Sequence, residues 1–185
     1  QPNITAHKDA ATPLFEAAAL NSSRCLPLLL AAKADIEVGM ARNHSPLFAA
    51  ATFNNLDVMR QLLAAKADIE AATSDDDTSP LYIAAQRGNA DSVKELLSAK
   101  ANCTLARSSD GATALFVASQ NRRNECVKML LESAADVNVA RTSDGFSPLH
   151  LAAELGYVDT IELLVAYKGD VNKENHVKLL PLYYA

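Results

Sequence analysis

Histidines are the residues of this 185-residue chain whose chemistry would be the most versatile, since they serve as general bases and as metal ligands. Either role needs a partner nearby, such as a serine, a cysteine or a carboxylate. The four histidines fall in separate segments without a partner at ligand spacing: His7, His44, His150 and His176. We therefore predict that His150 is structural. We expect no catalytic, cofactor-binding or metal-binding residue, so the chain is not an enzyme and has no cofactor.

Cysteines and clustered aspartates give the same result. Cys25, Cys103 and Cys126 are odd in number and include no C-x-x-C pair, so they do not form a disulfide framework. Unpaired cysteines of this kind suit a reducing compartment, and we expect an intracellular protein, cytoplasmic or nuclear. The run Asp75 to Asp77 lacks the pattern of a calcium-binding loop. We expect a solvated loop tip there.

Composition narrows the fold class and the partners. Hydrophobic residues make up 49% of the chain, with no tryptophan and few aromatic residues, which favours closely packed helices over an aromatic-rich β-sandwich. The net charge of -5 argues against nucleic acid, whose binding depends on clustered Lys and Arg. No apolar run approaches the roughly 18 residues of a membrane span. We expect a monomer that binds neither nucleic acid nor a membrane.

The elements that would position any site come from an internal repeat. A four-residue motif recurs at spacings of 33 or 34 residues. Small residues follow each motif, then a leucine-rich run, then Ala-Asp-Ile or a close variant. The motif copies are Thr12-Pro13-Leu14-Phe15, Ser45-Pro46-Leu47-Phe48, Ser79-Pro80-Leu81-Tyr82, Thr113-Ala114-Leu115-Phe116, Ser147-Pro148-Leu149-His150 and the weaker Leu180-Pro181-Leu182-Tyr183.

Each landmark predicts local structure. Ser or Thr before Pro starts a helix, because the hydroxyl caps a free N–H and proline suits the first helical position. Gly and Asn tolerate a left-handed backbone and end helices, so a mid-repeat turn is expected at Asn21, Asn54, Gly88, Arg122 and Gly156. Arg122 does not fit this pattern and should be strained. Helical spacing predicts that the second helices bury Leu26, Leu29, Leu30, Val93, Leu96 and Leu97.

These motifs resemble the ankyrin repeat, whose pattern runs T-P-L-H-x-A-A, Gly, a leucine run, then G-A-D-V-N and D-G. The resemblance implies an all-α solenoid of stacked helix-turn-helix units with short projecting β-hairpin loops. It implies a curved stack with the hairpin tips toward the concave face. We expect a single domain over 1–185, with repeats at about 10–42, 43–76, 77–110, 111–144 and 145–177 and a partial repeat at 178–185.

Three features depart from the family pattern. The glycine after the second helix is replaced by Lys33, Lys66, Lys100, Ala134 and Lys168. A left-handed non-glycine residue costs about 1 kcal/mol, so either the array accepts this or these turns have another shape. Pro27 should lie about one turn inside a second helix and bend it. The motif histidine survives only as His150, and aromatic residues replace it elsewhere.

In the resembled family, partners contact the hairpin tips and the residues just before the mid-repeat turn. Aromatic, Met and Arg side chains are enriched at interfaces. The alternative is that some of these side chains only pack against the next repeat. The candidate partner-binding residues are Leu20, Met40, Arg42, Phe53, Asp75, Asp76, Arg87, Arg107, Arg141, Phe146 and Leu155.

The resemblance implies a module that binds another protein and catalyses nothing. The alternative is a regulatory or targeting domain of a larger enzyme or channel. The start at Gln1 and the end at Ala185, inside a first helix, lead us to expect a longer parent protein. Ankyrin repeats of the A-D-V-N type are also targets of asparagine hydroxylation, and Asn138 and Asn172 match that position. The alternative is that each asparagine simply hydrogen-bonds its own turn.

Overall fold

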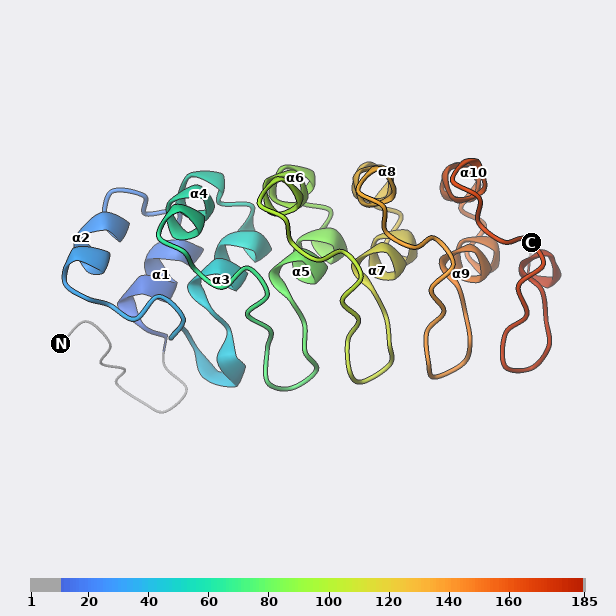
Figure 1. Cartoon of the computed structure of the whole chain (residues 1–185), viewed down its shortest axis with the longest axis horizontal. Helices are drawn as coiled ribbons and strands as arrows, with labels where there is room; N and C mark the ends of the chain where they lie inside the picture. The colour runs from blue at the N-terminus through green and yellow to red at the C-terminus, as the bar shows by residue number, and fades with distance from the viewer. Residues whose placement is uncertain (1–10, 185) are drawn as a thin grey trace. The chain divides into compact units, whose positions relative to one another are not determined.

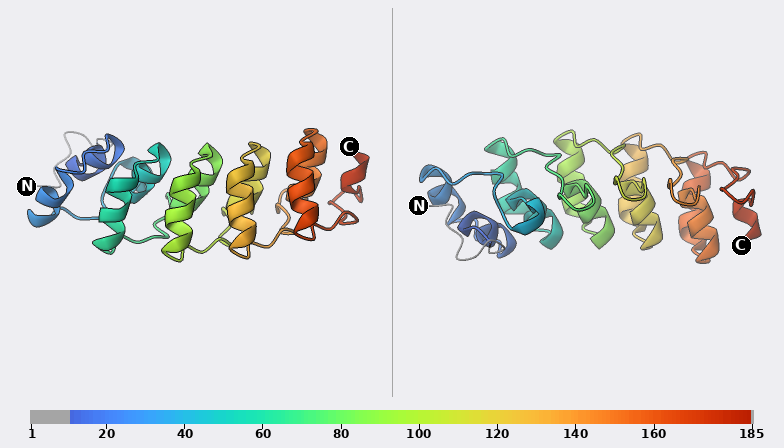
Figure 2. Two further views of the ribbon diagram at one scale, coloured as in Figure 1. Left: turned by 90° about the horizontal axis from the view of Figure 1, so that it is seen from above. Right: turned by 90° about the horizontal axis from the view of Figure 1, so that it is seen from below.

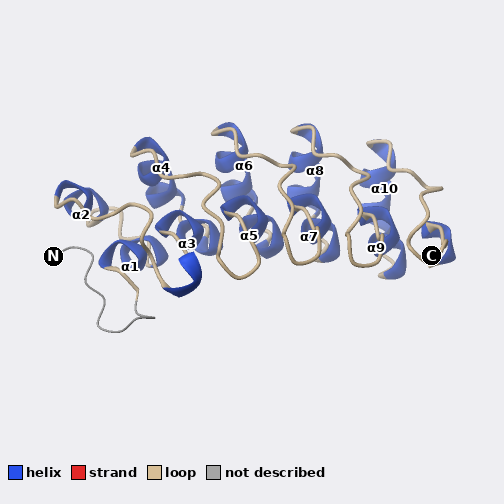
Figure 3. Ribbon diagram, turned by 60° about the horizontal axis from the view of Figure 1, so that its bottom comes forward, coloured by secondary structure: helices blue, strands red, loops and turns tan. Residues whose placement is uncertain are grey.

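The chain forms short α-helices in consecutive pairs, in a computed structural model that describes residues 11–184. In this described part no segment forms a β-strand, as Figure 3 shows. Two short 3-10 helices accompany the α-helices, η1 (Ala41–Asn43) and η2 (Pro181–Tyr183). The α-helices are α1 (Pro13–Ala19), α2 (Leu26–Ala31), α3 (Pro46–Phe53), α4 (Leu56–Ala64), α5 (Pro80–Arg87), α6 (Ala90–Ser98), α7 (Ala114–Gln120), α8 (Asn124–Glu132), α9 (Pro148–Glu154) and α10 (Val158–Ala166).

The chain divides into two compact units, which we describe separately. The first comprises residues 1–84 and 91–101, and the second comprises residues 85–90 and 102–185. In the second unit α7 packs against α9 and α8 against α10, so equivalent helices of successive repeats lie side by side (Figure 1). The view from above shows the neighbouring second helices α8 and α10 lying side by side (Figure 2). In the first unit α1 packs in the same way against α3.

Helix starts follow the sequence prediction. The hydroxyl of Ser45 accepts a hydrogen bond from the N–H of Phe48 at 3.1 Å, and Pro46 is the first residue of α3. Equivalent caps begin α1, α5, α7 and α9, and α7 starts correctly although Ala114 replaces the proline. At α9 the cap is reciprocal, because the N–H of Ser147 also donates to the His150 ring. The hydroxyl cap alone is therefore sufficient to fix these starts.

In both units the buried residues recur with the period of the sequence repeat. Small residues of the first helices, such as Ala50, Ala84, Ala118 and Ala152, are fully buried, which allows the neighbouring helix to approach closely. Removing a buried leucine from such a core costs about 2–5 kcal/mol. Of the residues predicted to be buried in second helices, Leu26, Val93 and Leu96 are, while Leu29, Leu30 and Leu97 are half-buried. The equivalent buried leucines are Leu14, Leu47, Leu81, Leu115 and Leu149 in first helices, and Leu62, Leu96, Leu130 and Leu164 in second helices.

Left-handed turns occur at every position where the sequence suggested them. The mid-repeat residues Asn21, Asn54, Gly88, Arg122 and Gly156 have φ between 53° and 80°. The residues that replace the family's glycine, Lys33, Lys66, Lys100, Ala134 and Lys168, have φ between 60° and 72°. These turns therefore keep the left-handed shape and do not adopt another one, which decides between the two alternatives given by the sequence. The array accepts a left-handed side chain at each site.

Pro27 shortens its helix, and the prediction that it bends the helix is wrong. Pro27 lies in the first turn of α2, which has 6 residues, whereas α4, α6, α8 and α10 each have 9. A proline has no N–H to donate to the carbonyl four residues earlier. The helix begins at Leu26, so Pro27 lies in the first turn, where N–H groups have no partner within the helix and the missing one breaks no hydrogen bond. The residues before α2 form a turn, in which the Cys25 N–H donates to the Ser22 carbonyl at 2.9 Å.

The projecting loops are hairpin-shaped but too short to form strands. The Arg141 N–H donates to the Phe146 carbonyl at 2.8 Å, and Gly145 is left-handed at φ 76°. Among the described residues, isolated β-bridges pair Met40 with His44 and Ala106 with Thr113. Further backbone bonds go to the neighbouring loop, as from the Thr142 N–H to the Asp110 carbonyl at 2.7 Å. Successive loop tips in the second unit are thus tied together below α7 and α9 (Figure 1).

Candidate protein-binding surface

His150 completes the capping box of α9, and its two ring nitrogens contact Ser147 in the same repeat and Leu179 in the following partial repeat. Its Nδ1 lies 2.8 Å from the Ser147 hydroxyl, and its Nε2 lies 3.1 Å from the Leu179 carbonyl oxygen. The side chain is fully buried, so this Ser–His contact is out of reach of a substrate. Across residues 11–184 no three His, Cys, Asp or Glu side chains gather as a metal site would require. His7 lies outside the described residues.

The three cysteines are free thiols in different surroundings. Burial raises the pKa of Cys126 to about 11, which keeps it a protonated, unreactive thiol at neutral pH. Cys25 holds the equivalent position in the first repeat but is exposed, because the late start of α2 leaves it outside the helix. None of the helices in the described part of the chain has the length and apolar character needed to span a membrane.

Two large apolar side chains end the first helices of the first unit. Leu20 caps α1 and Phe53 is the last residue of α3, at the same position of successive repeats. Their side chains are 72% and 57% exposed, whereas Ala18 and Ala51, two residues earlier, are fully buried. The packing between α1 and α3 therefore uses the small residues and leaves Leu20 and Phe53 in solvent. Met40, in the loop before α3, is also exposed.

In the second unit the same helix-end position carries an arginine in one repeat and a leucine in another. Arg87 is exposed at the end of α5, and Leu155 is exposed at the cap of α9. The guanidinium of Arg87 pairs with no side chain of residues 11–184. The helix-end position therefore varies in chemistry between repeats while its exposure is retained.

The acidic loop tip is organised by hydrogen bonds. Asp76 accepts from the hydroxyls of Thr73 at 3.0 Å and Thr78 at 2.5 Å, which closes the turn. Asp75 lies on the outside of the turn, 3.3 Å from Arg42 of the preceding loop, and both side chains are exposed. A hydrogen bond from Thr73 and the charge of Arg42 lower the pKa of Asp75 below its ordinary value. Asp76 is thus a brace of its turn, and Arg42 and Asp75 remain at the surface.

The two loop arginines of the second unit form ion pairs within their own turns. Arg107 Nη2 lies 2.6 Å from Asp110 Oδ2, and Arg141 Nε lies 3.2 Å from Asp144 Oδ1. Burial raises the pKa of Asp144, but hydrogen bonds from Arg141 and from a backbone N–H outweigh it and hold the pKa below its ordinary value. The guanidinium of Arg141 also lies 5.0 Å from the centre of the Phe116 ring. Both arginines are half-buried.

Phe146 belongs to the packing of the last repeat. Its ring centre lies 5.4 Å from that of His150 and 5.2 Å from that of Tyr184. The side chain is half-buried, so part of it stays accessible.

The two asparagines that match the hydroxylation position lie in different environments. Asn138 Oδ1 accepts a hydrogen bond from the Asp170 N–H at 2.8 Å, and its Nδ2 donates to the Lys168 carbonyl at 3.4 Å. The Asn172 side chain is exposed. In both, the backbone N–H donates to the Asp two residues earlier, at 2.8 Å in Asn138 and 2.9 Å in Asn172.

The sequence analysis did not predict several polar side chains that form hydrogen bonds from one repeat to the next. Asn55 Nδ2 donates to the carbonyls of Ala18 at 2.7 Å and Ala19 at 2.9 Å, which satisfies the end of α1. Arg123 Nε reaches the Gln86 carbonyl at 3.4 Å. The Asn-Asn pair at residues 54–55 indicated a turn in the sequence. The carbonyls that Asn55 binds lie in the preceding repeat, and no local sequence pattern identifies them.

The repeated, identically capped helix pairs define an all-α repeat protein. A family model of ankyrin repeats in three copies matches residues 1–73 and 81–175. The chain belongs to the ankyrin-repeat family, and the fold class predicted from the sequence, an ankyrin-repeat solenoid, is confirmed. Ankyrin repeats are generally protein–protein interaction modules, and proteins of the family are typically not enzymes. No curated protein matches the chain.

Proposed function

We propose that this chain binds another protein through the exposed ends of its first helices and the neighbouring loop tips, and that it carries out no catalysis. The observation that carries the proposal is the exposure of Leu20 and Phe53 at equivalent positions of adjacent helices. Two large apolar side chains next to each other are what a partner would desolvate to gain affinity. The repeat itself has no packing use for them, since small residues fill the contact between α1 and α3.

The side chains that line this surface suit a partner with both apolar and charged groups. Leu20, Met40 and Phe53 supply apolar anchors, and the Arg42–Asp75 ion pair supplies exposed charges of both signs. An exposed ion pair of this kind contributes little to stability, so it can be rearranged when a partner docks. In the second unit, Arg87 separately offers an exposed cation at the equivalent helix-end position.

The test is partner capture followed by measured affinity. The intact chain is used to capture proteins from its native cell, and the captured partner is then titrated by calorimetry against point variants. Phe53→Ala and Arg87→Ala should each weaken binding by at least about 1–2 kcal/mol, because binding energy concentrates in a few central anchors. Their melting temperatures should stay close to that of the unmodified chain, because both side chains are exposed.

Lys94→Ala is the matched control, since Lys94 is exposed on the second helix α6. It should change neither affinity nor melting temperature. If Phe53→Ala lowers the melting temperature and spares binding, Phe53 is part of the packing and the proposed surface is wrong.

The same module could be the regulatory or targeting part of a larger enzyme or channel, and the full-length sequence would decide this. We further propose that the protein is an intracellular monomer, in the cytoplasm or nucleus. Three free thiols, one of them exposed, support a reducing compartment. Cell fractionation tests the location. Light scattering tests the oligomeric state, and recovery of a dimer would contradict the monomer.

A further inference from the structure

Two arginines of the second unit come together at the end of α5. Arg87 is the last residue of that helix, and Arg123 comes from the following repeat, directly before α8. Arg123 Nε donates to the Gln86 carbonyl at 3.4 Å, and a Cβ atom added at Gly88 would lie 2.6 Å from Arg123 Cδ. The Arg123 side chain therefore lies along the backbone on both sides of Arg87. Both arginines are exposed, so two cationic side chains share one place on the surface.

This arginine pair lacks the acidic partners that the other arginines of the unit have. Those partners are aspartates, in the ion pairs of Arg107 with Asp110, Arg122 with Asp159 and Arg141 with Asp144. No carboxylate of residues 11–184 forms an ion pair with Arg87 or Arg123. Within the described residues, the Gln86 carbonyl is the acceptor that Arg123 reaches, and it uses only Nε. Most donors of the two guanidinium groups are therefore available to an acceptor from another molecule.

The fold gains little from placing these two charges together. A cation at the end of α5 interacts favourably with the negative end of the helix dipole, which accounts for Arg87. Arg123 also stands directly before α8, and a positive charge at the start of a helix opposes its dipole. Two like charges at one place also repel each other. A bound negative charge would remove this repulsion and accept hydrogen bonds from the unused donors.

We propose that Arg87 and Arg123 bind an acidic segment of the protein partner, with an Asp or Glu carboxylate held by both guanidinium groups. The planar guanidinium matches a carboxylate and donates two parallel hydrogen bonds to it. Opposite charge also speeds association and discriminates among partners. The inference rests on the proposed protein-binding function, and it adds the chemistry of the segment that the second unit recognises.

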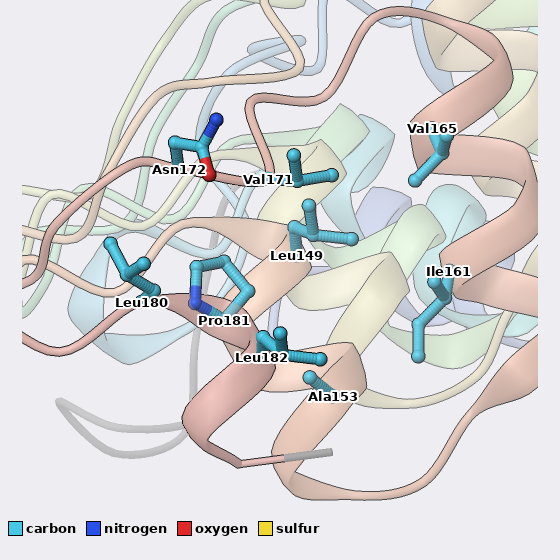
Figure 4. Close-up of a pocket in the computed structure, with 9 residues that line it drawn as sticks. All are labelled: Leu149, Ala153, Ile161, Val165, Val171, Asn172, Leu180, Pro181 and Leu182. Carbon is cyan, nitrogen blue, oxygen red and sulfur yellow. The ribbon is translucent and has the colours of Figure 1, made fainter.

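The apolar groove of the same unit provides an internal comparison. It lies between α9, α10 and η2, and the side chains that line it carry no charge (Figure 4). An acidic peptide gains nothing there, because its carboxylates would lose hydration without an ion pair in return. Binding at the arginine pair can therefore be distinguished by position from unspecific adhesion to the chain.

The probe is a capped hexapeptide of glutamate, titrated into the isotope-labelled full chain and followed by NMR. We expect saturable shifts of the Nε–H signals of Arg87 and Arg123 and of the amides at 86–88 and 122–124. The amides that border the groove of Figure 4 should not shift. Raising the ionic strength from about 0.1 M to about 1 M should abolish the shifts, since the screening length falls from about 10 Å to about 3 Å. A hexapeptide of glutamine, which has the same length without charge, should produce none.

Three variants of the full chain test the role of the arginine pair. Arg87→Gln and Arg123→Gln should each weaken peptide binding about threefold to tenfold, since each removes one charged donor group. Lys128→Gln is the matched control, because it removes the same single charge from an exposed position of α8 where Lys128 has its own partner, Glu132. It should bind the peptide normally. Circular dichroism checks that each variant is folded.

Equal weakening by Lys128→Gln, or equal binding of the glutamine peptide, would overturn the proposal. So would saturation by inorganic phosphate at a lower concentration than the glutamate peptide needs, since the site would then be one for a phosphate group. The peptide test does not depend on the captured partner. If the peptide fails to bind while Phe53→Ala weakens the captured partner, the protein-binding function stands and the acidic recognition is wrong.

Discussion

Asn138 and Asp170 are joined across two successive repeats, with the side-chain oxygen of Asn138 2.8 Å from the backbone nitrogen of Asp170. The amide nitrogen of Asn138 completes the contact at the Lys168 carbonyl. One amide group thus satisfies a donor and an acceptor that flank Gly169, directly after the left-handed residue Lys168. A turn that lacks the family's glycine is in this way held from outside by the neighbouring repeat.

We expect Asn138→Ala to lower the free energy of unfolding by about 0.5–1.5 kcal/mol, the net contribution of the hydrogen bonds to the Asp170 N–H and the Lys168 carbonyl, which water replaces in the variant. Urea unfolding followed by circular dichroism measures this. Asn172→Ala is the control at the equivalent position, where the side chain is exposed. Its stability should change by less than about 0.5 kcal/mol. An equal loss in both variants would contradict the role assigned to Asn138.

Lys66→Gly and Lys100→Gly should each stabilise the chain by a few tenths to about 1 kcal/mol. Both residues are left-handed, at φ 66° and 72°, a conformation in which a Cβ atom is strained. Denaturant midpoints measure the change. Lys94→Gly, in the helical backbone of α6, should instead destabilise by about 1 kcal/mol. If all three substitutions lower the midpoint, the flexibility of glycine outweighs the strain.

Glu37 gives the first repeat a distinct pH dependence. It holds the position of Asn138, and its Oε1 accepts a hydrogen bond from the Asp68 N–H at 2.8 Å. A carboxylate cannot donate as an amide does, and Glu37 Oε2 is buried without a partner in the described residues. Burial, with the charges of Asp68 and Asp35, raises the pKa of Glu37 above its ordinary 4.5 despite that hydrogen bond.

A folded-state pKa above the unfolded one means that the protonated form stabilises the fold. This contribution is complete below pH 4.5 and is lost as the pH rises through the folded-state pKa. Glu37→Gln should therefore raise the melting temperature at neutral pH, with the gain shrinking in acid. Asp144, whose pKa is lowered, should behave oppositely, so that Asp144→Asn destabilises at neutral pH and less in acid. A gain for Glu37→Gln that is independent of pH would contradict this assignment.

If an asparagine hydroxylase acts on this protein, Asn172 should be modified before Asn138. Both groups of the Asn138 amide are engaged with the next repeat, whereas the Asn172 side chain is exposed. Mass spectrometry of protein from its native cell measures the occupancy of each site. Modification of Asn138 alone would contradict the expectation.

The helix starts and turns could be predicted because short segments determine them. A hydroxyl residue before a proline caps a helix wherever it occurs, and Asn54 or Gly88 adopts a left-handed turn at little cost. Lys66 left two alternatives open, because its own preference opposes the geometry that the repeat requires. The structure shows that the repeat prevails, as it does at Arg122 with φ 53°.

The candidate surface was predictable only in part. The exposure of Leu20 and Phe53 follows from their place at the helix ends. The partners in the ion pairs of Arg107 and Arg141 stand in the sequence as Arg-x-x-Asp. The pattern alone does not predict the pairing, because the two side chains meet only when the turn between them is tight. The contact of Asn55 with α1 could not be predicted, since its acceptor is a carbonyl 37 residues away.

The polar contacts between repeats join residues of nearly constant separation along the chain. Asn138 and Asp170 are 32 residues apart, Arg42 and Asp75 are 33, and Asn54 and Ser92 are 38. The entropy lost on closing a loop grows only with the logarithm of its length, so each junction meets nearly the same kinetic barrier. Folding can thus begin at any one junction and spread to its neighbours, at a rate that inserting or deleting a whole repeat would change little.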